Sequence, residues 1–70
     1  MMPLVYAETG KSLIIRKISG SPEVKRHLED LGFNVGTEVS VVSILGENVI
    51  VKVKESRIAV SSELARKISI

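Results

Sequence analysis

A chain of 70 residues forms one domain, close to the size at which a single core only just offsets the entropy lost on folding. Hydrophobic residues make up 44% of the chain, but Tyr6 and Phe33 are the only aromatic residues, so the core must be aliphatic. The chain has no cysteine, which excludes disulfides and thiolate metal sites. Its net charge of +2 is spread along the sequence and gives no strong field for a polyanion.

The N-terminal segment predicts no targeting signal. Met1–Tyr6 lacks a basic leader and a long apolar run, so we expect neither a signal peptide nor insertion into a membrane, and a cytoplasmic location is the default. Leu4–Ala7 is expected to be an extended arm, with Leu4 and Tyr6 on the same side. Ser12–Ile18 has the composition of a strand, but its apolar residues do not alternate cleanly, so we predict a bulge or a bend.

One helix is predicted over Pro22–Leu31. Ser21 can accept a hydrogen bond from an exposed amide of the first turn, and proline suits the first helical position. Gly32 can take the positive φ that ends a helix, which lays Phe33 back over Leu28 in a Schellman ending. The expected inner face is Val24, Leu28 and Leu31, and the outer face carries Lys25, Arg26, Glu29 and Asp30. Because the helix is too short to be stable alone, it must pack on a sheet.

Two hairpins are predicted after a second tight turn at Gly36, and their interior side chains are valines and one isoleucine. The first hairpin has Leu45–Glu47 as its loop; its register pairs Val39 with Val53 and Val41 with Val51 inside, and Glu38 with Lys54 and Val42 with Ile50 outside. The second hairpin turns at Glu55–Ser56 and pairs Ile58 with Val53 and Val60 with Val51. Both hairpins therefore bury the same face.

A helical turn at Ser62–Arg66 and a closing strand at Lys67–Ile70 complete the chain. The predicted fold is mainly β: a small, strongly bent barrel of about five strands, with one α-helix between the first and second main strands. Barrel closure is favoured because it removes exposed strand edges. The whole of residues 1–70 is predicted to be a single domain.

No catalytic constellation can be assembled from these residues. With one histidine, no cysteine and no glycine cluster of the phosphate-loop type, the chain is predicted not to be an enzyme. Glu23, His27 and Asp30 fall on one helical stripe, and two carboxylates with an imidazole resemble a ferrous-iron ligand set. We favour the alternative in which His27 is an ordinary helix residue and the acids are solvated. No metal or cofactor is assigned beyond weak transition-metal binding at these residues.

The sequence also indicates what kind of partner to expect. Nucleic-acid binding needs exposed aromatic residues beside cations, and Tyr6 is the only candidate, so we predict no nucleic-acid partner. Lys52, Lys54 and Arg57 form a basic corner, which we interpret as edge protection and solubility. The outward pair Val42 and Ile50, with Arg26, is the candidate protein-binding surface; alternatively, the Leu4–Tyr6 arm covers the pair.

The segment Leu31–Val39, preceded by Leu28 and basic residues, resembles the L-G-φ-x-x-G-x-x-V motif of the FeoA family, in which Leu31, Gly32, Phe33 and Gly36 are the motif positions. The resemblance extends to other positions along the chain: Leu4, Gly10, Ile15, Ile18, Val51, Val53, Ile58, Ala59, Ala65 and Ile68. It implies an SH3-like barrel.

The resemblance also implies a function. FeoA proteins are small cytoplasmic proteins associated with ferrous iron uptake, so it implies an accessory protein, monomeric or weakly dimeric, that modulates a FeoB-type membrane transporter by contacting its cytoplasmic part or its membrane domain. Two alternatives remain open. One is a metal-responsive regulatory domain like those that end some metal-dependent repressors, and the other is a small RNA- or ribosome-associated barrel.

Overall fold

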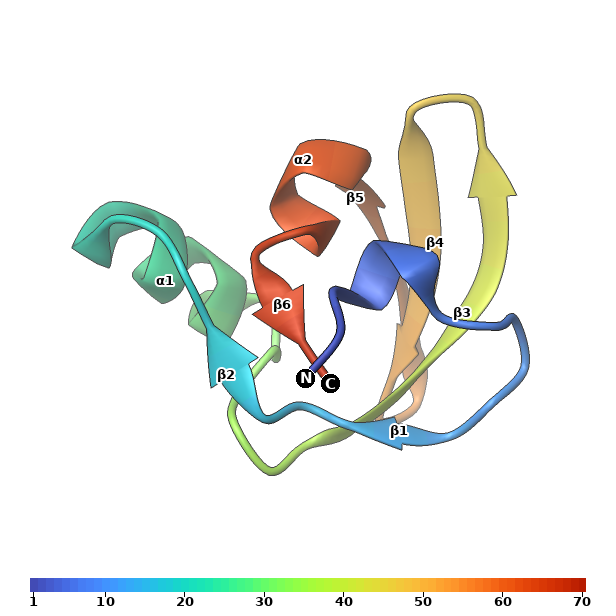
Figure 1. Ribbon diagram of the computed structural model, residues 1–70, viewed down its shortest axis with the longest axis horizontal. Coiled ribbons are helices and arrows are strands. Elements are labelled where there is room, and N and C mark those ends of the chain that lie inside the picture. Colours follow the sequence, from blue (N-terminus) through green and yellow to red (C-terminus); the bar gives the residue numbers. More distant parts are fainter.

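The protein folds into six strands, two α-helices and one turn of 3-10 helix in this computed structural model, which describes residues 1–70 (Figure 1). In chain order the elements are the 3-10 helix Leu4–Tyr6, β1 (Leu13–Ile14), β2 (Lys17–Ile18), α1 (Pro22–Asp30), β3 (Glu38–Leu45), β4 (Asn48–Val53), β5 (Ser56–Ser61), α2 (Ser62–Ala65) and β6 (Ile68–Ser69). The mainly β architecture, with α1 between the N-terminal strands and the long strand β3, is as predicted. Neither helix has the length and apolar character needed to cross a membrane.

The strands form two antiparallel sheets around one core. The larger sheet has the order β1-β3-β4-β5, and β2 pairs with β6 in the smaller one. The predicted bend in the first strand is confirmed, because β1 and β2 belong to different sheets and the chain turns between them. Ile15, at this turn, is buried, and its backbone binds two adjacent residues just before β3: its N–H donates to the Thr37 carbonyl at 3.0 Å and its carbonyl accepts from the Gly36 N–H at 2.8 Å.

Helix α1 begins and ends as the sequence predicts. The Ser21 hydroxyl accepts a hydrogen bond from the Val24 N–H at 3.3 Å, and Pro22 occupies the first helical position. At the other end Gly32 has a φ of +105°. The Phe33 N–H donates to the Leu28 carbonyl and the Gly32 N–H to the Glu29 carbonyl, both at 2.9 Å. These two bonds make the Schellman ending, which turns the Phe33 ring into the core.

The core is aliphatic apart from one ring. All 14 buried residues are hydrophobic, and Phe33, Leu4, Ile15 and Leu28 are the largest of those that are fully buried. Five of the six residues predicted inside the barrel are buried, namely Val39, Val41, Val51, Val53 and Val60. The sixth, Ile58, is half-buried because β5 is the last strand of its sheet. On α1 Leu28 is buried and Val24 and Leu31 are half-buried, so the predicted inner face is confirmed.

The first hairpin differs from its prediction beyond Val41. Val39 pairs with Val53 and Val41 with Val51, as expected, but Val42 forms a β-bulge, and Ser43 takes its place opposite Ile50. The predicted pair of Val42 and Ile50 is therefore wrong. The extra residue shortens the turn to two residues, Gly46 and Glu47, instead of the predicted three. The expected pair of Glu38 with Lys54 is also absent from the ladder, because β4 ends at Val53.

The second hairpin turns one residue earlier than predicted. Its turn is Lys54–Glu55, so Ile58 faces Val51 and Val60 faces Val49, a register two residues away from the expected one. Since side chains alternate along a strand, a shift of two keeps the same residues on the buried face. The face was therefore predicted correctly and the pairing was wrong.

The N-terminal segment is not the extended arm that was predicted. Leu4–Tyr6 is a turn of 3-10 helix, which buries Leu4 and leaves Tyr6 65% exposed, so these two side chains point in different directions. The residues before this turn are tied to the barrel: Pro3 bridges to Ser69, and Met2 and Ile70 exchange two backbone hydrogen bonds of 3.0 and 2.8 Å. The 3-10 helix and the residues before it therefore cover the end of the barrel near the two termini (Figure 1).

Lys54 is the one non-glycine residue with a positive φ, +56°, and it stands at the first position of its turn. A side chain costs about 1–2 kcal/mol in this conformation, whereas glycine adopts it freely. We expect Lys54→Gly to raise the free energy of unfolding by about 0.5–1 kcal/mol after allowing for the greater entropy of glycine in the unfolded chain. Thermal unfolding followed by circular dichroism measures this. Glu55→Gly is the control, because Glu55 has no positive φ to relieve; equal gains from both variants would contradict the explanation.

Candidate protein-binding site

The three residues considered for metal binding do not form a metal centre. Glu23, His27 and Asp30 all belong to α1, and all three are exposed. The structure has no group of three or more His, Cys, Asp or Glu side chains placed to hold a metal ion. These residues therefore occupy a solvated helix surface.

The two main surface depressions are open and shallow. One of about 200 Å³ is lined by Ser12, Glu38, Val39, Ser40, Lys52 and Lys54. The other, of about 370 Å³, is lined by Met2, Ser12, Leu13, Ile14, Arg16 and Ile70. His27 lines neither, so no serine in them has an imidazole base beside it. The arrangement offers surfaces for contact rather than a pocket that encloses a small substrate.

The residues predicted to bind a partner do not form one patch. Arg26 is exposed on α1, which lies on the opposite side of the molecule from the β3–β4 hairpin (Figure 1). Ile50 is half-buried on the outer face, between Ser43 on one side and Ala59 on the other. Val42 is half-buried in the bulge and is no longer opposite Ile50.

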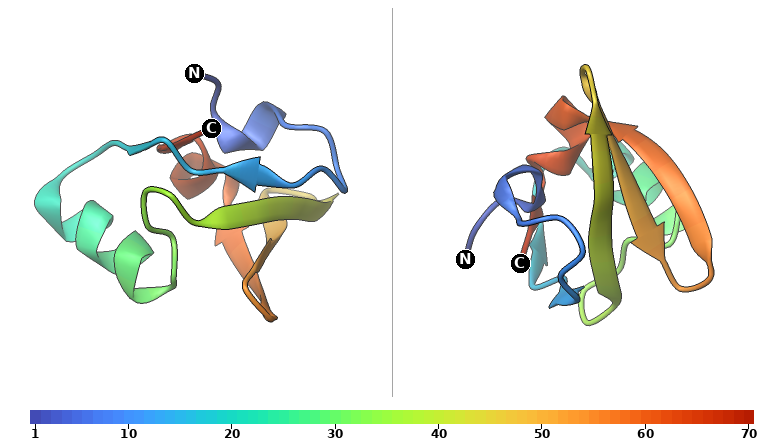
Figure 2. Two further views of the ribbon diagram at one scale, coloured as in Figure 1. Left: turned by 90° about the horizontal axis from the view of Figure 1, so that it is seen from below. Right: turned by 90° about the vertical axis from the view of Figure 1, so that its right-hand side faces the viewer.

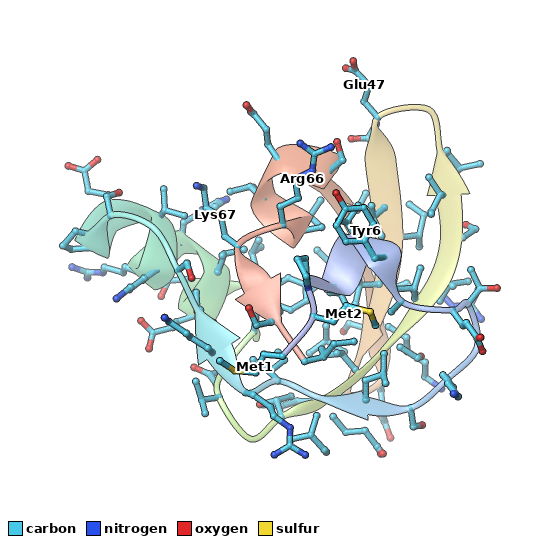
Figure 3. All side chains as sticks on the ribbon, in the orientation of Figure 1. Met1, Met2, Tyr6, Glu47, Arg66 and Lys67 are labelled. Atoms are coloured by element: carbon cyan, nitrogen blue, oxygen red, sulfur yellow. The ribbon has the colours of Figure 1, made fainter.

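The most exposed pair of adjacent branched-chain residues is at the end of β3. Ile44 is 52% and Leu45 is 63% exposed, directly before the turn formed by Gly46 and Glu47. The β3–β4 hairpin extends beyond the rest of the molecule (Figure 2), and Glu47 points away from it at the tip (Figure 3). Ile44 pairs with Val49 and so faces the inner side of the sheet, whereas Leu45 pairs with Asn48 on the outer side. The tip therefore presents an apolar side chain on each of its two sides.

The sequence prediction does not include this exposed pair, because the predicted loop begins at Leu45, whereas in the structure Leu45 is paired with Asn48. The signal was present: two large aliphatic residues stand immediately before a Gly-Glu turn, where the core no longer needs them. Only the bulge at Val42, which the sequence does not reveal, extends the ladder to Leu45. Ladder pairing then fixes the face of the hairpin on which each side chain lies.

A row of cations lies on the same outer face, nearer the other end of the hairpins. Lys52 and Arg57 are directly opposite each other in the β4–β5 ladder, and Lys54 follows in the turn. All three are exposed, and none forms an ion pair; the single ion pair of the molecule joins Lys11 and Glu8 at 3.8 Å. The predicted basic corner thus exists as a cross-strand row of like charges. Tyr6, on the 3-10 helix, is on a separate element.

Comparison with known proteins identifies the family. A family model described as the FeoA domain matches residues 2–70, nearly the whole chain. The chain belongs to the FeoA family. A Methanocaldococcus jannaschii protein, named provisionally as Fe(2+) transport protein A, is 33% identical to this FeoA chain over 70 residues, which is all of this chain and 85% of the relative.

Solved structures agree with this FeoA fold. The structure of Stenotrophomonas maltophilia FeoA in complex with zinc, described as an SH3 domain protein, superposes with a TM-score of 0.83 at 25% identity and covers 99% of this chain and 88% of its own. The predicted SH3-like barrel is therefore confirmed. A manganese-dependent transcriptional repressor also superposes, with a TM-score of 0.85 at 17% identity, over 94% of this chain but 38% of the repressor. At that identity the likeness is one of fold alone.

Proposed function

We propose that this FeoA protein is a cytoplasmic accessory protein of ferrous iron uptake, which modulates a FeoB-type membrane transporter by binding to its cytoplasmic part. In this proposal the chain performs no chemistry of its own and carries no resident cofactor. Membership of the FeoA family and the name of the M. jannaschii relative support the link to ferrous iron. Action by protein contact is inferred from the exposed pair of Ile44 and Leu45 at the hairpin tip.

The tip has the properties of an anchor for a protein partner. Burying one such aliphatic side chain contributes about 1.5–3 kcal/mol, and a hairpin held by ladder hydrogen bonds loses little entropy on binding. Because Ile44 and Leu45 lie on opposite sides of the tip, one flat surface cannot cover both. The partner is therefore expected to receive the tip in a cleft, with both side chains at the centre of the interface.

The test is a titration of isotopically labelled protein with the soluble cytoplasmic part of the transporter, followed by NMR. We expect shifts centred on residues 43–49. The double variant Ile44→Ser and Leu45→Ser is expected to bind about tenfold to a hundredfold more weakly, which corresponds to a loss of roughly 1.4–3 kcal/mol.

The matched control is Val35→Ser, because Val35 is similarly exposed, at 65%, but lies in the loop between α1 and β3, away from the tip. It is expected to bind like the unmodified protein. Unchanged binding by the double variant would exclude the tip as the anchor, and no binding by the unmodified protein would exclude the transporter's cytoplasmic part as the partner.

A further inference from the structure

Strand β5 has a free edge. It is the last strand of the four-stranded sheet and is hydrogen-bonded to β4 alone. None of the backbone hydrogen bonds outside the helices and ladders involves residues 56–61. Because the turn Lys54–Glu55 has two residues, the flanking pair of Val53 and Ser56 exchanges hydrogen bonds, and the pattern then alternates. The N–H and C=O groups of Arg57 and Ala59 therefore point away from β4.

Nothing in the fold covers this edge. Arg57 and Ala59 are exposed and Ile58 is half-buried, and the strand contains neither a proline nor a bulge. On the other side of the sheet, the start of β3 is covered by the N-terminal part of the chain. There β1 pairs with the start of β3, and the Gly10 N–H donates to the Val41 carbonyl at 2.8 Å. The start of β3 is thus paired on both sides, whereas β5 offers a regular row of unsatisfied backbone groups along its length.

The side chains beside the free edge carry an uncompensated positive charge. Like charges placed directly opposite on adjacent strands are destabilising, yet Lys52 faces Arg57 without an acidic residue within ion-pairing distance of either. Glu55 lies in the turn with Lys54, and Glu38 lines a surface depression with Lys52 and Lys54, but neither forms an ion pair. Cationic side chains at an edge repel a strand that carries like charges, and they attract one that carries acidic residues.

We propose that β5 is a docking strand for an extended, acidic protein segment, which adds to the sheet as an additional antiparallel or parallel strand. The backbone of the segment would satisfy the groups of Arg57 and Ala59, and its carboxylates would lie over the row of Lys52 and Arg57. An inward-facing side chain of the segment would cover Ile58. Assigning this segment to the cytoplasmic part of the transporter rests on the proposed function, whereas the chemistry of the docking strand does not depend on it.

A model peptide tests the docking strand directly. The probe is a short synthetic peptide that alternates threonine and glutamate, and its counterpart with lysine in place of glutamate is the control. In NMR titrations of the full chain we expect the acidic peptide to shift the amide signals of β5 and to slow hydrogen exchange at Arg57 and Ala59. The lysine peptide is expected to do neither. Exchange that stays fast at both amides with a saturating acidic peptide would overturn the proposal, as would shifts confined to other elements.

Two variants separate the backbone contribution from the charge contribution. Ala59→Pro removes an N–H that the β4 ladder does not use, so it is expected to keep the fold and weaken peptide binding about tenfold. Ala59→Val keeps the N–H and is the matched control. Arg57→Glu is expected to weaken the acidic peptide by a similar factor and to create affinity for the lysine peptide, a reversal that remains measurable even where the proline variant fails to fold. Equal binding by all variants contradicts the inference.

The transporter experiment distinguishes this inference from the proposed function. Binding of the transporter's cytoplasmic part that Ala59→Pro and Arg57→Glu leave unchanged would sustain the proposed function and overturn β5 as its docking strand. Peptide binding without transporter binding would sustain the docking strand and overturn the partner. Dimerisation through β5 is the competing outcome. It would appear as concentration-dependent protection of Arg57 and Ala59 without peptide, and would show that a second copy occupies the edge.

Discussion

Replacing Phe33 with alanine is expected to leave much of the protein unfolded at room temperature. Phe33 is the largest fully buried side chain and the one ring in an aliphatic core, and the Schellman ending of α1 fixes its position. Removing a buried phenylalanine costs about 3–5 kcal/mol. At roughly 0.05–0.15 kcal/mol per residue, a domain of this size has a total stability of about 3.5–10 kcal/mol. At the lower end of this range the loss equals the whole stability.

Urea unfolding followed by far-ultraviolet circular dichroism measures this loss. Tyr6→Ala is the matched control, because Tyr6 is the other aromatic residue and is 65% exposed on the 3-10 helix. That variant is expected to change the free energy of unfolding by less than about 0.5 kcal/mol. A loss below about 1 kcal/mol for Phe33→Ala would mean that the ring does not organise the core.

Gly32→Ala is expected to destabilise the protein by about 2–3 kcal/mol. Two effects combine there: a φ of +105° disfavours any side chain, and an added Cβ would lie 3.3 Å from a methyl group of Val53. The second effect arises because the residue that ends α1 lies against Val53, the last residue of β4. The Schellman ending also has to persist for Phe33 to stay in the core.

Gly36→Ala isolates the conformational effect. Gly36 also has a positive φ, +91°, but an added Cβ there would meet nothing within 4 Å. We expect about 1–2 kcal/mol for this variant, so that the difference between the two substitutions measures the contact with Val53. Chemical denaturation of both variants under one set of conditions gives that difference. Equal losses would show that the close approach of α1 to β4 contributes nothing.

The elements with local signals were predicted from the sequence. The Ser21-Pro22 start and the Gly32 end of α1 depend on residues within one turn of each other, and the structure has both. The buried face of each hairpin was also predictable, since alternation survives any shift by two residues. The SH3-like fold followed from these signals together with the motif of Leu31–Val39.

The features that the sequence did not predict are set by long-range contacts. The bulge at Val42 has no residue signature of its own, because a valine fits an ordinary strand equally well. The second turn was placed one residue late because lysine is an unusual choice for a positive φ, and Lys54 adopts it under the constraint of two paired strands. The first hairpin's register places Ile44 and Leu45 at its tip. The candidate surface is therefore Ile44 and Leu45 and not the predicted pair of Val42 and Ile50.

The backbone pairing of Met2 with Ile70 holds the two ends of this domain side by side. Its entry and exit points sit together, on the side of the molecule away from the hairpin tip (Figure 1). A domain with this geometry can be spliced into a loop of a host protein with little distortion of either, since the gap to be spanned is only the width of two neighbouring strands. A tether at either end likewise leaves the far side of the barrel facing outward and unobstructed.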